Sequence, residues 1–229
     1  MKFGIVGGIG PASTLDYYDG LTKKYYDATG ECAPLVIDSI NMYAMTGLLS
    51  KGDNEGVTRL ILSSLENLSA AGATAAAMAS NTPHIVFDEL VKRSPLPLLS
   101  IVDETCKYIE KMGFRRALIL GTEFTMKSGL YSAPLEKYGI KAVTPNEKDM
   151  ALVHSFIFPK LENGIVDEED KKKMVATAER YIAEQKADCA VLGCTEIPLM
   201  IHEGDFTVPT VNTAGVHIDA IAEFMIKNR

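Results

Sequence analysis

Two pairs of short segments recur in the chain at a single spacing, and this internal repeat constrains the fold more than any other feature. Gly7 and Gly121 each end a strand-like run, while Ser80 and Cys194 each follow a later apolar run; both pairs have the same separation (121 − 7 = 194 − 80 = 114). Each pair has the same context, in which a buried strand is followed by small or polar residues and a helix start. An offset of about half the 229-residue chain predicts two similar lobes.

Apolar runs of strand length alternate with longer amphipathic segments. The expected strands are Lys2–Val6, Leu35–Ile37, Thr74–Met78, Leu98–Ile101, Ala117–Leu120, Ile140–Val143, Cys189–Leu192 and Thr207–Val211. The expected helices are Leu15–Tyr26, Val57–Ala71, Val102–Met112, Met150–Leu161, Lys172–Gln185 and Ala214–Lys227. This alternation predicts an α/β fold of two Rossmann-like lobes with mainly parallel, buried sheets. We expect an N-terminal lobe of residues 1–97 plus 209–229 and a C-terminal lobe of residues 98–208.

The composition is typical of a globular protein with an acidic surface. Apolar residues make up 47% of the chain, charged residues 23%, and the net charge is −7. Nucleic acids and anionic membranes attract basic surfaces, so neither is expected as a partner. No run approaches the ~20 apolar residues of a membrane span. The N-terminus also lacks the basic region and cleavage site of a secretory signal, so we expect a cytoplasmic protein.

The four cysteines give no sign of a metal site or of disulfides. Cys32, Cys106, Cys189 and Cys194 form no CxxC pair and no zinc-like spacing with histidine. In a reducing cytoplasm they are expected to be free thiols. A free cysteine is most often a small core residue, and this is the first interpretation of each one.

Ser80 and Cys194 differ from the rest of the chain in their expected position. Ligands of open α/β sheets bind beyond the carboxyl ends of the strands. The repeat puts these two residues at equivalent strand ends of the two lobes. We therefore expect them on opposite walls of one cleft between the lobes, which would be the active site.

Cys194 follows a buried strand and precedes an expected helix start. Amide groups at a helix N-terminus favour anions and lower a thiol pKa from about 8.5, which suits a thiolate base or nucleophile. Glu196 lies two residues further on and could orient a neighbour or cap the helix. The alternative is a packed core cysteine in front of an N-cap, Thr195.

The segment Ser80–His84 contains residue types that cap helices or bind anions. Ser80, Asn81 and Thr82 are of this kind, and Pro83 suits a first helical turn. The alternative is an ordinary helix cap, and a histidine such as His84 is more often structural than catalytic.

The glycine-rich segment Gly7–Thr14 follows the first strand but fails the dinucleotide fingerprint. Ser13 stands where the third glycine would be, and Pro11 removes an amide from the phosphate-binding turn. Asp38, after the second strand, keeps a nucleotide site as an alternative. The favoured interpretation is a tight loop that lets a small ligand approach the backbone, with Gly121 and Thr122 as its counterpart.

Four segments together resemble the aspartate/glutamate racemase family. They are Gly4–Pro11, Ser80–His84, Gly193–Ile197 and Asn212–His217, which span the chain from the first strand to the last helix. The resemblance implies two Rossmann-like lobes, frequent homodimers, no cofactor and an amino-acid substrate. It also implies two cysteines that flank the substrate's α-carbon, one removing the α-proton and the other donating a proton to the opposite face.

Carried onto this sequence, the resemblance implies Cys194 on one face and Ser80 in the place of the other cysteine. Proton removal from a weakly acidic α-carbon also requires stabilisation of the substrate carboxylate. A side-chain carboxylate would need a basic partner, for which Lys51 and Lys160 are the candidates; the alternative is that either is a solvated surface lysine. Aspartate is chosen over glutamate as the substrate. The full set of expected substrate-binding residues is Ile9, Gly10, Lys51, Asn81, Thr82, Thr122, Lys160 and Thr195.

The serine at position 80 leaves several functions open, because a hydroxyl is a far weaker base than a thiolate. Ser80 could be an engineered, disabling substitution, or the enzyme could work asymmetrically with Cys194 as base and Ser80 or a water on the other face. The chain could also be a one-cysteine isomerase or decarboxylase, or a non-catalytic binder of an acidic amino acid. The asymmetric racemase is the favoured interpretation.

Overall fold

The computed structural model describes residues 1–229, which divide into two compact units. The first comprises residues 1–101 and 217–229, and the second comprises residues 102–216. Both boundaries lie later in the chain than expected from the sequence. The reason is strand pairing: residues 98–99 pair within the first sheet and residues 210–212 within the second.

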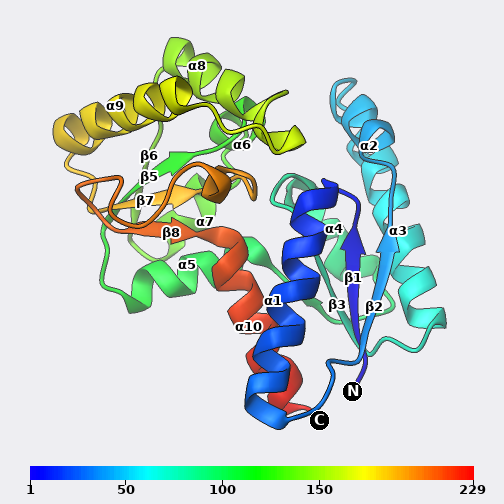
Figure 1. Ribbon diagram of the computed structural model, residues 1–229. Helices are drawn as coiled ribbons and strands as arrows, with labels where there is room; N and C mark the ends of the chain where they lie inside the picture. The colour runs from blue at the N-terminus through cyan, green and yellow to red at the C-terminus, as the bar shows by residue number, and fades with distance from the viewer. The chain divides into compact units, whose positions relative to one another are not determined.

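Each unit contains one four-stranded sheet in which every pair of neighbours is parallel (Figure 1). The first sheet has the order β2-β1-β3-β4 and the second the order β6-β5-β7-β8, so the two sheets share one topology. The first contains β1 (Phe3–Gly7), β2 (Leu35–Ser39), β3 (Ala75–Met78) and β4 (Leu98–Leu99). The second contains β5 (Arg116–Leu120), β6 (Lys141–Val143), β7 (Cys189–Leu192) and β8 (Thr210–Asn212).

The strand register reproduces the repeat seen in the sequence. Val6 pairs with Met78 in the first sheet, and Leu120 pairs with Leu192 in the second. The offset between these pairs is the same as before (120 − 6 = 192 − 78 = 114). The two central strands of each unit are therefore equivalent, and the prediction of two similar α/β lobes is confirmed.

In the first unit, the core lies between the sheet and the surrounding helices. Val6, Ile61, Leu65 and Met78 are among its buried residues, with α3 lying against β1 and β2. Helices α1 and α10 run side by side (Figure 1), joined by an ion pair between Lys24 and Asp219. The helices are α1 (Pro11–Thr29), α2 (Met42–Leu49), α3 (Asn54–Ala70), the 3₁₀ turn η1 (Thr82–Val86), α4 (Phe87–Arg93) and, from His217 onward, α10 (Thr213–Lys227).

In the second unit, helices α8 and α9 contribute Val153, Met174 and Ala178 to a core with Leu118 and Leu120 of β5. Asn146 and Asp167 cap these two helices by accepting hydrogen bonds from backbone N–H groups, which satisfies part of each N-terminus. The helices are α5 (Ile101–Lys111), α6 (Glu123–Lys127), α7 (Ser132–Lys137), α8 (Glu147–Ile157), the 3₁₀ turn η2 (Leu161–Asn163), α9 (Glu168–Gln185) and the 3₁₀ turn η3 (Ile197–Leu199).

All eight strands and the long helices lie where the sequence predicts them, whereas the short helices are not predicted. Helices α2, α4, α6 and α7 have at most eight residues, too few for a clear helical period. One of them, α2, lies between β2 and Lys51, so this lysine stands in the turn between α2 and α3. None of the helices is both long and apolar enough to cross a membrane.

Candidate active site

The first unit has a cluster of candidate residues at the carboxyl ends of β1 and β3. The loop after β1 runs close to the chain leaving β2, because Gly8 has φ +81° and a Cβ there would lie 2.4 Å from the Ile40 carbonyl oxygen. Gly10 precedes α1, and Thr14 accepts a hydrogen bond from the Gly8 N–H at 2.8 Å. Ile9 is buried in the same loop. The loop is thus a tight turn in which glycine allows close approach of the chain that leaves β2.

Ser80 lies just beyond β3, next to that loop. Ser13 fixes the segment from α1 by donating a hydrogen bond to the Ala79 carbonyl at 2.7 Å. The Ser80 side chain is 7% exposed. Its hydroxyl hydrogen-bonds to no other group of the chain. No side chain is therefore placed to take a proton from Ser80.

Asn81 and Thr82 follow at the start of η1, with Asn81 buried and Thr82 half-buried. His84 lies behind them, stacks on Phe87 and accepts a hydrogen bond from the Ile101 N–H at 3.3 Å. Burial lowers the pKa of His84 to about 4, against a smaller opposing effect from the backbone of Ser80 and Asn81. His84 is therefore a neutral residue that supports the segment.

The second unit repeats this arrangement at the carboxyl ends of β5 and β7. Gly193 donates a hydrogen bond to the Leu120 carbonyl at 2.6 Å. A Cβ at Gly121 would lie 3.1 Å from the Gly193 carbonyl oxygen, so glycine lets the two strand ends approach. Thr122 accepts a hydrogen bond from the Thr125 N–H and caps α6. This close approach fixes the backbone immediately before Cys194.

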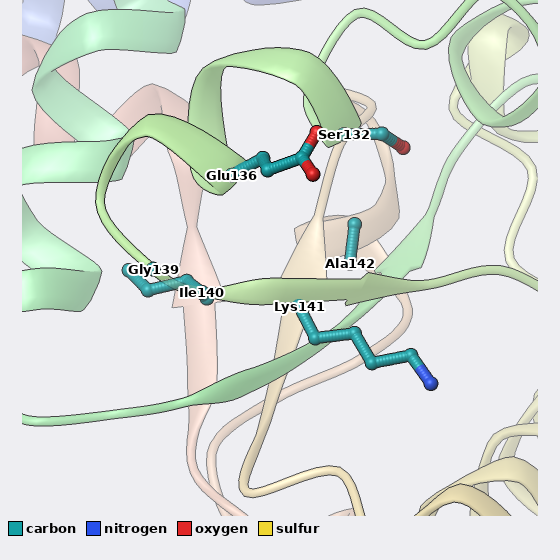
Figure 2. A pocket seen from close by; sticks show the side chains of 6 residues that line it. All are labelled: Ser132, Glu136, Gly139, Ile140, Lys141 and Ala142. Atoms are coloured by element: carbon teal, nitrogen blue, oxygen red, sulfur yellow. The ribbon is translucent and has the colours of Figure 1, made fainter.

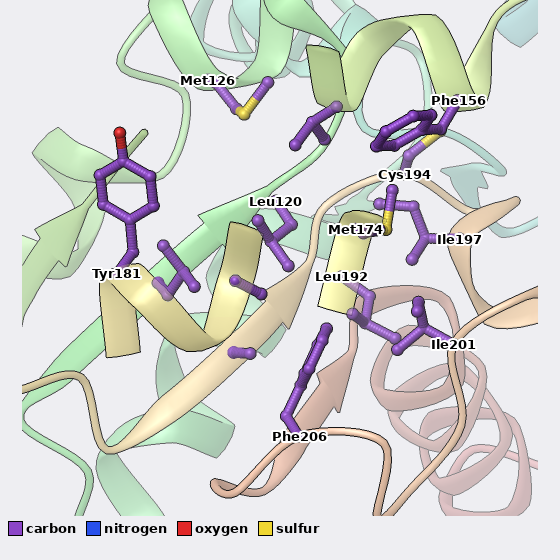
Figure 3. Packing of buried hydrophobic residues seen from close by; sticks show 14 of the residues in the cluster. Leu120, Met126, Phe156, Met174, Tyr181, Leu192, Cys194, Ile197, Ile201 and Phe206 are labelled. Carbon is purple, nitrogen blue, oxygen red and sulfur yellow. The ribbon is translucent and has the colours of Figure 1, made fainter. Parts of the chain in front are cut away.

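Cys194 is 9% exposed and packs in the core beside Phe156, Met174 and Ile197 (Figure 3). Burial and the charge of Glu196 raise the pKa of its thiol well above the usual range. The expectation of a lowered pKa is therefore wrong. The main physical reason is burial of the thiol in the core, to which the charges of Glu196 and Glu162 add. In addition, β7 leads into the single turn η3 and not into an α-helix.

Glu196 is the nearest polar partner of the cysteine. The Cys194 thiol donates a hydrogen bond to Glu196 Oε2 at 2.9 Å, and the Thr195 hydroxyl donates to the same oxygen at 2.9 Å. Glu196 is only 6% exposed. Thr195 thus donates its hydroxyl hydrogen to the Glu196 carboxylate and does not cap a helix.

Glu162, on η2, is a charged neighbour of Glu196 and Cys194 that no sequence motif marks. Burial and the nearby charge of Glu196 raise its pKa, and its own charge adds to the rise in the Cys194 pKa. Only the folded chain brings η2 to the end of β7, so no local pattern marks Glu162.

The two candidate lysines differ in their surroundings. Lys51 is an exposed residue in the turn between α2 and α3. Lys160 forms ion pairs with Asp170 and, at 3.3 Å, with Asp167. Two carboxylates of the chain already neutralise Lys160, whereas the charge of Lys51 is open to solvent.

A pocket of about 400 Å³ lies elsewhere in the second unit, against α7 and β6 (Figure 2). Lys141 and Ala142 leave opposite faces of β6 there, while Glu136 comes from α7. None of the candidate residues lines it.

Asp38 gives no support to the alternative of a nucleotide site. Its side chain accepts a hydrogen bond from Asn67 of α3.

Comparison with known proteins links this arrangement to one family. The family model Asp/Glu/Hydantoin racemase matches residues 6–221. The broad specificity amino-acid racemase RacX of Bacillus subtilis (strain 168) is 24% identical over 223 residues, which cover 92% of each chain.

Two solved structures match almost the whole chain. An aspartate racemase homologue from Pyrococcus horikoshii OT3 is 33% identical, with a TM-score of 0.84, over 98% of this chain and 99% of that one. The Picrophilus torridus aspartate racemase is 26% identical, with a TM-score of 0.76, over 100% of this chain and 94% of that one.

Proposed function

The chain belongs to the Asp/Glu/hydantoin racemase family, and from this premise we propose that it is a cofactor-independent racemase of an acidic amino acid. Aspartate is the proposed substrate, with glutamate as the second choice. The reaction is removal of the α-proton from one face of the substrate and delivery of a proton to the other. Cys194 acts on one face, and Ser80, directly or through a water, acts on the other.

A single contrast supports this asymmetric form of the reaction. The Cys194 thiol lies 2.9 Å from a carboxylate oxygen that can accept its proton. The Ser80 hydroxyl has no such partner. A base must be able to pass on its own proton before it takes one from carbon. Cys194 therefore removes the α-proton efficiently, and Ser80 does so poorly.

The repeat supports the proposal that both residues act on one α-carbon. Ser80 and Cys194 follow equivalent strands, β3 and β7, which have the same register with their neighbours. We assign the substrate carboxylate to Asn81, Thr82 and Thr122 together with the backbone at Ile9, Gly10 and Thr195, because the Thr195 hydroxyl already donates to Glu196. Negative charge develops on that carboxylate as the α-proton leaves, and hydrogen-bond donors stabilise it.

Side-chain recognition of an acidic substrate requires a cation, and Lys51 is proposed for this role. It is the candidate lysine whose charge is open to solvent. Lys160 is a weaker candidate because Asp167 and Asp170 already bind it.

We also propose a homodimer in the cytoplasm. Helix α1 exposes Leu15, Tyr18 and Tyr26 on one face, with 69%, 51% and 59% of each residue accessible. An apolar stripe of this kind is suited to burial against a second copy. The four cysteines are all free thiols, which agrees with a reducing compartment.

A second candidate function is a one-cysteine isomerase, a decarboxylase or a non-catalytic binder of the same ligand. The observation that favours it is Ser80, whose hydroxyl lacks any proton acceptor. Such proteins would bind the amino acid without exchanging its α-proton on both faces.

Proton NMR in D₂O distinguishes these functions. The purified protein is incubated separately with each enantiomer of aspartate and glutamate, and the α-proton signal is followed. The racemase predicts loss of that signal, faster from the enantiomer whose α-hydrogen faces Cys194, with slower inversion. The absence of exchange with all four compounds would contradict the proposal and leave the second candidate function.

A further inference from the structure

Building on the proposed function, we propose that Glu196 is the proton acceptor for the Cys194 thiol, so that the two side chains operate as one acid–base pair. Glu196 acts through Cys194 and is not assigned a contact with substrate. By giving its proton to Glu196, the cysteine becomes a thiolate base inside a core that is nearly closed to solvent.

The hydrogen-bond geometry carries this inference. Glu196 Oε2 lies 2.9 Å from Cys194 Sγ and 2.9 Å from Thr195 Oγ1. Both neighbours donate, so this oxygen is an acceptor in the resting state. Cys194 is 9% and Glu196 6% exposed, which leaves the carboxylate as the adjacent site for the thiol proton.

The electrostatics explain why the thiol needs such an acceptor. The charges of two ionisable groups affect the thiol pKa: Glu196, which lies beside Cys194, and Glu162, which lies on η2. Both are acidic, and together with burial they raise the Cys194 pKa. A free thiolate next to a charged Glu196 is thus unfavourable. Transfer of the proton within the pair leaves its total charge unchanged and avoids that arrangement.

The step balances without any other reactant. The thiol proton moves from Sγ to Glu196 Oε2, and the α-proton moves from the substrate carbon to Sγ. The electron pair of the broken C–H bond stays on the substrate and spreads into its carboxylate. A proton then reaches the opposite face of the carbon from the Ser80 side, and the pair returns one proton to solvent after product leaves.

Replacement of Glu196 tests the inference because two measurements are expected to change in opposite directions. In Glu196→Gln the negative charge is gone, so the Cys194 pKa falls and iodoacetamide alkylates Cys194 faster across a pH series. The acceptor is gone too, so α-proton exchange in D₂O falls by about 100-fold or more. If Glu196 did no more than raise the pKa of the thiol, Glu196→Gln would instead exchange α-protons faster than the wild type.

Glu162→Gln is the matched control. It removes the second acidic charge that raises the Cys194 pKa but leaves the hydrogen bond to Glu196 in place. Alkylation of Cys194 should become faster, and exchange should be at least as fast as in the wild type, because the acceptor Glu196 is still in place. Alkylation is followed on the peptide that contains Cys194, because Cys32 is exposed and also reacts.

The outcomes are distinguishable from failure of the proposed function. If Glu196→Gln exchanges α-protons as fast as the wild type, the acceptor role is overturned. If the wild type exchanges none, the racemase proposal fails, and the alkylation rates still test the pair, since equal rates in wild type and Glu196→Gln would overturn it. Should Glu196→Gln not fold, Glu196→Asp keeps a withdrawn carboxylate and should show reduced but measurable exchange; undiminished exchange would overturn the role.

Discussion

The Tyr17 hydroxyl lies 2.7 Å from Nδ1 of His217, a residue 200 positions further along the chain. His217 Nε2 lies 3.3 Å from the Leu99 carbonyl oxygen, which can only accept. The ring is therefore neutral with its hydrogen on Nε2, and Tyr17 is the donor to Nδ1. This one imidazole joins α1, α10 and β4 in the core of the first unit.

Tyr17→Phe is expected to lower the free energy of unfolding by about 1–3 kcal/mol, because it leaves a buried ring nitrogen without its donor. Urea unfolding followed by circular dichroism measures the change. Tyr43→Phe is the control, since Tyr43 is 76% exposed and its substitution should be nearly neutral. Equal effects of the two substitutions would contradict the assigned hydrogen bond.

The two buried histidines predict a loss of stability in mild acid. Burial lowers the pKa of His84 to about 4 and of His217 to about 3, from 6.5 in the unfolded chain. Below pH 6.5 the unfolded state binds protons that the folded state does not, so stability falls as the pH falls towards these folded-state values. At about pH 5, each histidine should cost about 2 kcal/mol relative to neutral pH.

Urea unfolding at neutral pH and at about pH 5 checks this sign and size, with His84→Gln and His217→Gln compared with the wild type. Each variant removes one titrating group, so the acid-induced loss should shrink by about 2 kcal/mol in each. A loss of the same size in all three proteins would show that other groups cause it.

The repeat made much of the fold predictable from sequence, because buried parallel strands are local patterns. Gly7 and Gly121, like Ser80 and Cys194, could be placed at strand ends from neighbouring residues alone. The environment of Cys194 could not. Its thiol pKa depends on burial in the core and on Glu162, which lies 32 positions before it (194 − 162 = 32) and approaches only in the folded chain.

Cys194→Ala should abolish α-proton exchange and turnover while leaving the fold and ligand binding nearly intact. The substitution removes the proposed base but little volume from the core around Met174 and Ile197. Exchange is measured by NMR in D₂O and binding by titration calorimetry. Cys189→Ala, a change at a buried cysteine within β7, is the control and should retain activity. A fully active Cys194→Ala protein would remove this residue from the mechanism.

Ser80→Cys should raise the rate for the enantiomer that the wild type processes poorly, by about tenfold or more, because a thiol is a stronger acid and, once ionised, a usable base. The rate for the other enantiomer should change less. Both rates are followed by chiral chromatography. If neither direction responds, Ser80 does not act on the face opposite Cys194.

Lys51→Met should weaken binding of aspartate by about tenfold or more, the loss of one charge-assisted hydrogen bond, with a smaller effect on kcat. The substitution removes an exposed cation from the turn after α2 and should leave the stability nearly unchanged. Lys160→Met is the comparison: it breaks the ion pairs with Asp167 and Asp170, so its main effect should be on stability and not on KM. Steady-state kinetics and urea unfolding of both variants separate these roles. A raised KM in Lys160→Met alone would transfer side-chain recognition from Lys51 to Lys160.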